Sequence, residues 1–295
     1  MADIAKPWML PQLKNIWRVC FGDTAQGTDF VFEHTLSLNR MLVSFDNAGQ
    51  PVAMLNWKPL EFTTPGARIP GGYIYGIATL PEHRGRGLSS GLIRQADEVL
   101  RGQAAKLSCL IPADKPLFGF YAARGFETRF YYKLVRVESD HIPPAADGGV
   151  LTTARLEDFE CERAAAFGGR TLFGAWGGEY LGYITRECRF YGGEVLLFSG
   201  RGKKGYAVCY RLKGGEVLVK ETTLTGQYIP LLLALLDRRY RAGSYQLRLP
   251  ADFELPRIHG GWGVEILPFG MVKWYDSEVS GAAGGSPWFA HGLDV

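Results

Sequence analysis

The segment between residues 73 and 100 limits most sharply what this chain can fold into. An apolar run ending at Leu80 predicts a strand, and residues 88–100 carry apolar side chains at helical spacing. Between them lies a short loop with two arginines and two glycines, Arg84, Gly85, Arg86 and Gly87. Glycines let backbone N–H groups face an anion, and a helix N-terminus carries partial positive charge. The segment is therefore interpreted as a strand–loop–helix unit that binds phosphate.

Two common phosphate loops do not fit this segment. No Gly-Lys-Ser/Thr follows the glycines, which excludes the Walker loop. Ser90 stands where the dinucleotide fingerprint requires its third glycine. The loop instead resembles the acyl-CoA loop of the GNAT N-acetyltransferase superfamily, Arg/Gln-x-x-Gly-x-Gly/Ala, with Ser89 in the last small position. A basic turn before an ordinary helix is the alternative interpretation.

The resemblance implies which residues hold acyl-CoA. The loop and the first turn of the helix would bind its phosphates through Arg84, Gly85, Arg86, Gly87, Leu88 and Ser89. The preceding strand would hydrogen-bond the pantetheine arm and the acyl carbonyl through the backbone of Ile77, Ala78 and Thr79. Acetyl-CoA is thus the implied cosubstrate.

A second segment supports the same family. Residues 117–126 resemble its Phe-Tyr-x-x-x-Gly-Phe pattern, in which a helix closes at a glycine, here Gly125. The resemblance implies that Tyr121 lies near the CoA sulfur and acts as a general acid toward the leaving thiolate. A phenol is protonated at neutral pH, which suits that role. The alternative is a packing tyrosine among Phe118, Phe120 and Phe126.

Composition narrows the class of protein. The 295 residues are enough for two domains, and 46% hydrophobic with 21% charged residues indicates a globular protein. The net charge of +3 is spread along the chain, so nucleic acid is not an expected partner. No apolar run of membrane-spanning length and no signal-peptide pattern occur, so no membrane partner is expected. Five scattered cysteines without a Cys-x-x-Cys pair indicate neither a metal site nor a disulfide framework, which fits a cytoplasmic protein.

The second half of the chain repeats landmarks of the first. Pro112-Ala113-Asp114 recurs as Pro250-Ala251-Asp252, and Gly125 recurs as Gly263, both at an offset of 138. Upstream, Ala78-Thr79-Leu80 corresponds to Thr222-Thr223-Leu224 at an offset of 144, so the second copy is six residues shorter. The missing six fall at Pro81–Arg86. The second copy is therefore predicted to lack the phosphate loop, although chance matches of short motifs are the alternative.

Periodicity and turn signals give a coarse α/β layout with a mixed sheet. Helices are expected over residues 10–21, 29–36, 88–100, 156–167, 180–188 and 228–240. Strands are expected over residues 41–45, 51–59, 72–80, 105–112, 127–136, 195–199, 205–213 and 216–224. Cys109 is expected in a core strand, and residues 229–236 in a buried helix.

Two tandem GNAT modules of this kind resemble the enhanced-intracellular-survival acetyltransferases. The expected domains are a catalytic domain over 1–137, a linker over 138–149, a degenerate domain over 150–279 and a C-terminal tail over 280–295. Each domain is expected to have a mixed, mostly antiparallel sheet flanked by helices. The family's sterol-carrier-like third domain is expected to be absent, because about twenty residues follow Trp274.

The general base and the amine acceptor are less constrained. In the resembling family the C-terminal carboxylate takes a proton in the active site, which here implicates Val295; a tail packed on the second domain is the alternative. Other possible bases are Glu33, His34, His83 and Asp114, and Glu33 and His34 lie where the fold builds its acceptor site. The expected acceptor is a primary amine of an aminoglycoside-like molecule, a polyamine or a lysine side chain. A non-catalytic acyl-CoA-binding protein and another acyl or aminoacyl transferase remain alternatives, as does a homo-oligomer.

Overall fold

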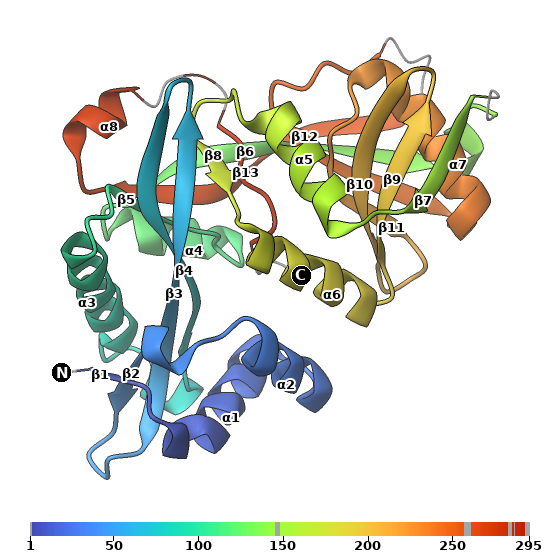
Figure 1. The fold of residues 1–295 in the computed structure, drawn as a ribbon. Coiled ribbons are helices and arrows are strands. Elements are labelled where there is room, and N and C mark those ends of the chain that lie inside the picture. The colour runs from blue at the N-terminus through green and yellow to red at the C-terminus, as the bar shows by residue number, and fades with distance from the viewer. Residues whose placement is uncertain (1, 145–147, 257–260, 283–284, 286, 293–295) are drawn as a thin grey trace.

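The computed structural model describes residues 2–144, 148–256, 261–282, 285 and 287–292. In that part of the chain α-helices flank a large mixed β-sheet, which confirms the predicted α/β class (Figure 1). The helices are α1 (Leu10–Phe21), α2 (Ala25–His34), α3 (Leu88–Gly102), α4 (Lys115–Ala122), α5 (Leu156–Phe167), α6 (Gly178–Phe190), α7 (Ile229–Tyr240) and α8 (Ser277–Ala282). The strands are β1 (Asp3–Ile4), β2 (Met41–Phe45), β3 (Pro51–Thr64), β4 (Ala67–Thr79), β5 (Leu107–Leu110), β6 (Glu127–Glu138), β7 (Gly149–Thr153), β8 (Phe173–Ala175), β9 (Glu194–Gly200), β10 (Lys203–Arg211), β11 (Val217–Thr222), β12 (Ser244–Pro250) and β13 (Trp262–Trp274).

The two halves of the chain share one continuous sheet. The strand order is β1-β2-β3-β4-β5-β13-β6-β12-β11-β10-β9-β7, with β8 paired to β3. Strand β13, from the end of the chain, lies between β5 and β6 of the first half. Strand β6 in turn pairs with β12 of the second half. Each half therefore supplies its last strand to the sheet of the other half.

The internal repeat has a clear structural counterpart. In the first half β4, α3 and β5 form a parallel strand–helix–strand unit, and β11, α7 and β12 form the same unit in the second half. The repeated landmarks fall at equivalent places, after β4 and β11, after β5 and β12, and around the starts of β6 and β13. Residues 223–228, which include the η5 turn (Gly226–Tyr228), join β11 to α7, whereas residues 80–87 join β4 to α3. The second connection is thus only two residues shorter and lacks the Arg-Gly-Arg-Gly sequence, and α7 is three residues shorter than α3. The prediction that all six missing residues fall at 81–86 is therefore wrong.

Strand alternation explains how the first half builds its layers. Met41 and Val43 of β2 are buried in a cluster with α1, whereas Leu42 between them is buried in a cluster with α3. Helices α1 and α3 thus cover opposite faces of the same strands. In the second half α5 and α6 contact β9 and β10, and α7 packs its apolar residues into a separate cluster with β11 and β12.

Most predicted elements are present, with shifted boundaries that have local causes. Helix α2 begins at Ala25 rather than residue 29, because the Thr24 hydroxyl caps it by accepting from the Gly27 N–H at 2.9 Å. Strand β3 continues to Thr64, since its hairpin with β4 is longer than expected. Residues 280–282, predicted as part of a flexible arm, belong to α8. Cys109 is buried in β5 and residues 229–236 lie in α7, as predicted.

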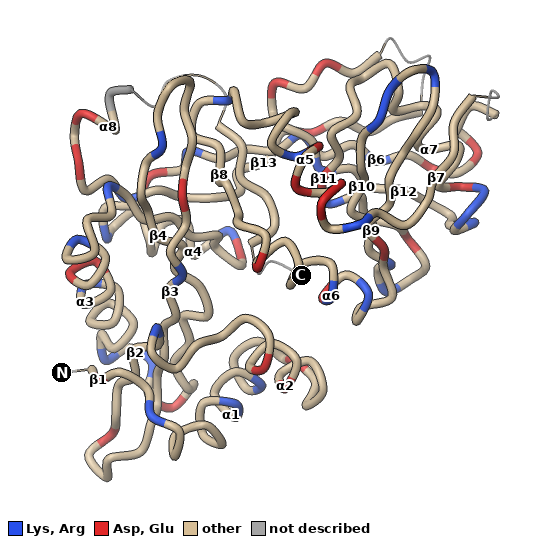
Figure 2. Tube along the Cα trace, in the orientation of Figure 1, with Lys and Arg blue, Asp and Glu red and all other residues tan. Residues whose placement is uncertain are grey.

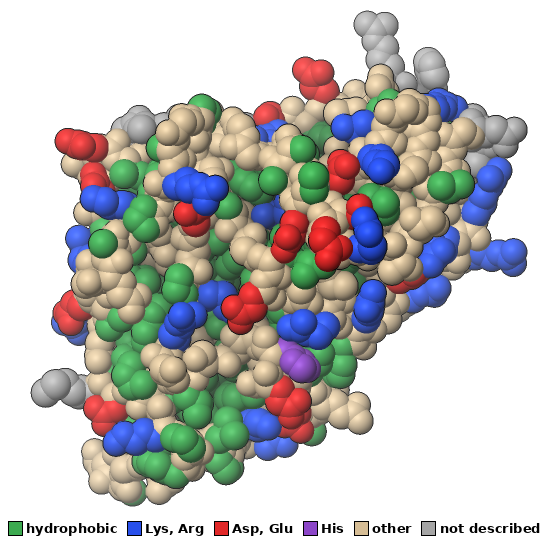
Figure 3. Space-filling model, viewed as in Figure 1, with side chains coloured by type: hydrophobic (Ala, Val, Ile, Leu, Met, Phe, Trp, Pro, Cys, Tyr) green, Lys and Arg blue, Asp and Glu red, His purple; other side chains and the backbone are tan. Residues whose placement is uncertain are grey.

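Charged residues of both signs are distributed over both halves of the chain (Figure 2). On the face drawn in Figure 3, acidic and basic side chains also lie close together among hydrophobic ones. Within the described residues, no helix is long and apolar enough to cross a membrane.

Candidate active site

The central feature of the site is a fork between β4 and β5. The two strands pair in parallel only from Gly71 to Tyr73, opposite Leu107 to Cys109. Beyond Tyr73, β4 bulges: Tyr75 pairs with Asn56 and Ala78 with Met54, so two β4 residues lie opposite one residue of β3. Gly76 allows this bulge with a left-handed φ of +61°. The strands then separate, and a cavity of about 750 Å³ opens between them.

The cavity has walls from both halves of the chain. The first half contributes the forked strands and α4, including Ile77, Ile111 and Tyr121. The second half contributes Arg248 of β12 and the middle of β13, from Leu267 to Phe269. These second-half residues were not among the predicted site residues, because nothing in the local sequence of β13 indicates its pairing with β5. The strand exchange therefore makes the second half part of this site.

The predicted phosphate loop lies at the open end of the fork. A short turn, η3 (Pro81–His83), leads into Gly85 and Gly87, whose φ angles are +75° and +76°. A Cβ at either glycine would meet no atom within 4 Å, so the backbone there faces open space. The Gly91 N–H makes the first intrahelical bond of α3, to the Gly87 carbonyl at 3.0 Å. The N–H groups of residues 88–90 precede it and can bind an anion.

Hydrogen bonds fix the loop to the end of β4. The Arg84 Nε donates to the Thr79 carbonyl at 3.1 Å, and the hydroxyls of Thr79 and Ser89 share a 2.8 Å hydrogen bond. Arg86 is exposed, and Leu88 is partly buried against the core beside α3. Arg124, which is not one of the predicted site residues, donates through Nη2 to the Ser90 hydroxyl at 2.6 Å. A third arginine thus lies beside the N-terminus of α3.

The predicted strand residues lie along one arm of the fork. Ile77 lines the cavity, whereas the Ala78 and Thr79 side chains are buried. Beyond Tyr73 the free edge of β4 pairs with no strand among the described residues. Its backbone groups are therefore available for a ligand that inserts into the fork as an extra strand would.

Tyr121 lies on α4, which faces the same cavity. The Asp114 carboxylate caps this helix by accepting from the Leu117 N–H at 3.1 Å, and Gly125, with φ +86°, follows its end. The Tyr121 ring packs edge-on against Phe120 and Phe126. Burial raises the pKa of Tyr121 to about 12, with Arg124 opposing the shift. The phenol therefore keeps its proton at neutral pH and can donate a hydrogen bond into the cavity.

The other predicted site residues are not gathered there. Glu33 and His34 are exposed at the end of α2. His34 lines a different cavity of about 630 Å³ between the halves, whereas Glu33 lines neither. Val295 lies outside the described residues. The last described residue, Gly292, is buried against Tyr73 and Ile111, which both line the Tyr121 cavity.

The cavity beside His34 contains an amine with altered basicity. Lys58 of β3 donates to the Thr35 hydroxyl at 3.2 Å and lies 4.7 Å from the centre of the Tyr180 ring. Burial lowers the pKa of Lys58 to about 8; Glu179 raises it and Arg40 lowers it further. The unfolded chain keeps the Lys58 proton up to about pH 10.4, whereas the folded chain loses it near pH 8. Between these two pH values, folding therefore releases the proton.

The protein should therefore become more stable, relative to a Lys58→Met variant, as the pH rises from 8 to 10.5. In this window the unfolded state binds more protons than the folded state, so stability rises with pH. Lys58 is partly exposed, which reduces the effect. We expect the difference in the free energy of unfolding between the wild type and Lys58→Met to change by about 1–2 kcal/mol over this pH range. Urea unfolding at pH 7 and pH 10.5 measures it. A difference that is independent of pH would mean that Lys58 titrates normally.

Comparisons with known proteins agree with this geometry. The sequence model of the family described as an acetyltransferase (GNAT) domain matches residues 5–129. A GCN5-related N-acetyltransferase from Anabaena variabilis superposes with a TM-score of 0.79 at 17% identity, covering 97% of this chain and 76% of that protein. A conserved protein of unknown function from Enterococcus faecalis, described as a probable N-acyltransferase, gives 0.76 at 17% identity over 95% and 73% of the two chains. Eis1 from Mycobacterium abscessus gives 0.68 at 15% identity over 94% and 74%.

No curated protein matches the chain. At these identities the solved structures show a common fold across nearly the whole chain. The family match covers the phosphate loop, the β4–β5 fork and Tyr121. Residues 5–129 of this chain therefore match the model of the GNAT acetyltransferase domain.

Proposed function

We propose that this protein is an N-acetyltransferase that transfers the acetyl group of acetyl-CoA to a primary amine. The observation that carries the proposal is the β4–β5 fork: its β4 arm continues into a glycine-rich basic loop, and the cavity between its arms is lined by a buried, protonated Tyr121. We assign catalysis to a domain over residues 1–137 and a supporting role to a degenerate domain over 150–279.

The described residues suit acetyl-CoA. The pyrophosphate would meet the N–H groups at the start of α3 together with Arg84 and Arg86, which combine backbone and side-chain positive charge. The pantetheine amides would pair with the free edge of β4 around Ile77. A fork of this shape leads the thioester toward Tyr121.

Tyr121 would stabilise the departing sulfur. The amine attacks the thioester carbonyl, and the carbon–sulfur bond breaks as the amide forms. A thiol has a pKa of about 8.5, so a thiolate is less basic than the Tyr121 phenolate. We therefore expect a strong hydrogen bond from the phenol to the sulfur in the transition state, rather than a free tyrosinate.

For the general base we propose the C-terminal carboxylate of Val295. Asp114 is a carboxylate that lines the cavity, but it already caps α4. Gly292 lies against the cavity wall, and three further residues can span at most about 10 Å. The proposal therefore requires these three residues to continue from Gly292 into the Tyr121 cavity, whose wall Gly292 already contacts.

The cavity favours a small amine or a peptide amine over a polycation. Among the described residues that line it, Asp114 is acidic while Lys115 and Arg248 are basic. Such a balance does not concentrate multiply charged aminoglycosides or polyamines. The second cavity, with His34 and Lys58, offers a route for the acceptor between the two halves. Whether the protein forms a homo-oligomer does not affect this assignment.

A thiol-release assay with acetyl-CoA and a panel of amines tests the proposal. Release that depends on the amine, with the acetylated amine identified by mass spectrometry, would support it. Tight CoA binding without release on any amine would instead indicate a non-catalytic acyl-CoA-binding protein. Faster release from a longer-chain acyl donor would indicate a different acyltransferase of the same fold.

Replacing Arg84 with glutamate should weaken CoA binding by about 10- to 100-fold. The change places a carboxylate where phosphate oxygens would lie and also removes a donor to the Thr79 carbonyl. Isothermal titration with CoA measures the effect. Arg189→Glu, on the exposed side of α6, makes the same change of net charge away from the loop and is the control. If the two variants bound CoA with equal affinity, Arg84 would not be part of the CoA-binding site.

A further inference from the structure

A buried carboxylate in the second half holds the C-terminal segment. Glu221 of β11 has no exposed surface and accepts hydrogen bonds from the side chains of Arg163 at 3.0 Å, Trp288 at 2.7 Å and Tyr206. The His291 Nε2 lies 2.7 Å from the same carboxylate. Two of these four partners, Trp288 and His291, belong to the C-terminal segment.

The charges in this cluster are matched. Burial alone would raise the pKa of Glu221, but Arg163 and His291 hold it well below its ordinary range, so the carboxylate stays ionised. Burial lowers the pKa of His291, which is therefore a neutral imidazole that donates through Nε2. Both tail side chains thus act as neutral donors to a charged acceptor, which makes these hydrogen bonds stronger than neutral ones.

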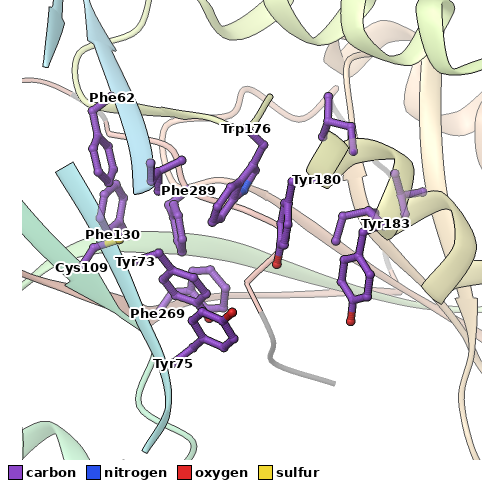
Figure 4. Close-up of a cluster of buried hydrophobic side chains, with 14 of the residues drawn as sticks. Phe62, Tyr73, Tyr75, Cys109, Phe130, Trp176, Tyr180, Tyr183, Phe269 and Phe289 are labelled. Atoms are coloured by element: carbon purple, nitrogen blue, oxygen red, sulfur yellow. The ribbon is translucent and has the colours of Figure 1, made fainter. Parts of the chain in front are cut away.

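Backbone contacts hold the same segment along its length. The Trp288 carbonyl accepts from the Gly174 N–H at 3.0 Å, and the Ala290 carbonyl accepts from the Trp176 Nε1 at 2.6 Å. The His291 carbonyl accepts from the Tyr180 hydroxyl at 2.9 Å. Between them the Phe289 ring is buried among Tyr73, Trp176 and other aromatic rings at the junction of the halves (Figure 4).

These contacts determine where the chain goes next. Gly292 follows directly and is so close to the cavity wall that a Cβ would lie 2.1 Å from the Ile111 Cδ1 and 2.8 Å from the Tyr73 hydroxyl. Tyr73 and Ile111 both line the Tyr121 cavity. His291 itself has a left-handed φ of +62°, which is unfavourable for a residue with a side chain. The hydrogen bonds of the His291 carbonyl with Tyr180 and of its Nε2 with Glu221 hold the residue in this conformation.

We propose that Glu221 is a positioning residue whose cluster with Arg163, Trp288 and His291, here called the tail latch, holds the C-terminal segment against the catalytic cavity. The inference rests on the proposed function for its catalytic consequence. Stability alone does not explain such a cluster, because apolar side chains of similar volume stabilise a core equally well without the desolvation of buried charges. The ionised Glu221 carboxylate instead requires hydrogen-bond donors, and the side chains of Trp288 and His291 supply two of them from the C-terminal segment.

If the tail latch holds the C-terminal segment, substitutions of Trp288 and His291 should change both the amide exchange of this segment and kcat. His291→Ala and Trp288→Phe each remove one donor to Glu221, whereas His291→Gln keeps a donor near the position of Nε2. We expect amide exchange of residues 288–292 to become about tenfold faster in the first two variants, with exchange in the rest of the chain unchanged. We expect kcat to fall by about tenfold or more while KM for acetyl-CoA stays within about twofold, and His291→Gln to recover most of the loss.

Gly292→Ala tests the same idea without altering the tail latch. Its methyl group should push the segment off Ile111 and Tyr73, so kcat should fall while Trp288 and His291 stay protected from exchange. Normal protection of residues 288–292 in both His291→Ala and Trp288→Phe would refute the tail latch. Faster exchange with unchanged kcat would refute its role in positioning. A wild-type protein without thiol release would reject the proposed function, and the exchange data would still decide whether Glu221 holds the tail.

Discussion

Tyr121→Phe is expected to lower kcat by about 10²- to 10³-fold and to leave the affinity for CoA within about twofold of wild type. The substitution removes only the phenolic oxygen, so the ring keeps its edge-on contacts with Phe120 and Phe126. The binding loop and the free edge of β4 are untouched. What is lost is the protonated donor that faces the cavity, which matters in the transition state as charge develops on sulfur. Steady-state thiol release and CoA titration measure the two quantities.

The pH dependence of kcat provides a second test of the role of Tyr121. Because burial raises the pKa of Tyr121 to about 12, loss of its proton should not reduce the wild-type rate below about pH 11. Tyr131→Phe, in a tyrosine that is largely exposed on β6, removes a hydroxyl outside the cavity and is the matched control. If Tyr121→Phe retained full kcat, the assignment of Tyr121 as the donor to sulfur would be wrong.

The parts of the site that could be predicted from sequence are local. The loop around Gly85 and Gly87 is a strand–turn–helix signal contained in about fifteen residues, and the structure has its glycines in the left-handed conformation that the interpretation needs. Tyr121 follows from its fixed spacing before Gly125, which follows the end of α4. The repeat also predicted the order of α5, α6, β9, β10, β11 and α7, but not β7, β8 or the long strand β13.

The remaining parts depend on contacts between distant residues. Strand β13 pairs with β5 across about 160 residues, and no property of either strand alone selects that partner over a strand of its own half. Glu221 lies within the run Lys220-Glu221-Thr222, which has the composition of an exposed strand end but is fully buried. Its partner Arg163 lies on α5, where an arginine ordinarily faces solvent. The burial of an ion pair such as Arg163–Glu221 cannot be recognised from the sequence around either residue.

Arg163→Met is expected to reduce the free energy of unfolding by about 3–5 kcal/mol, the effect of leaving a buried carboxylate without its counter-ion. Arg163 and Glu221 are 3% and 0% exposed, so water cannot replace the lost charge. Urea unfolding measures the loss. Arg155→Met, in an exposed pair with Asp158 near the start of α5, removes the same charge and should have little effect.

The double variant Arg163→Met, Glu221→Gln separates charge from packing. Glutamine removes the uncompensated charge, yet its carbonyl oxygen can still accept from Trp288 or Tyr206, so stability should recover in part. The two substitutions should therefore be clearly less destabilising together than the sum of their separate effects. Simple additivity would mean that the ion pair contributes nothing beyond the volume of its side chains. In that case the ionised state of Glu221 could not be the reason that the tail adopts a single docked position.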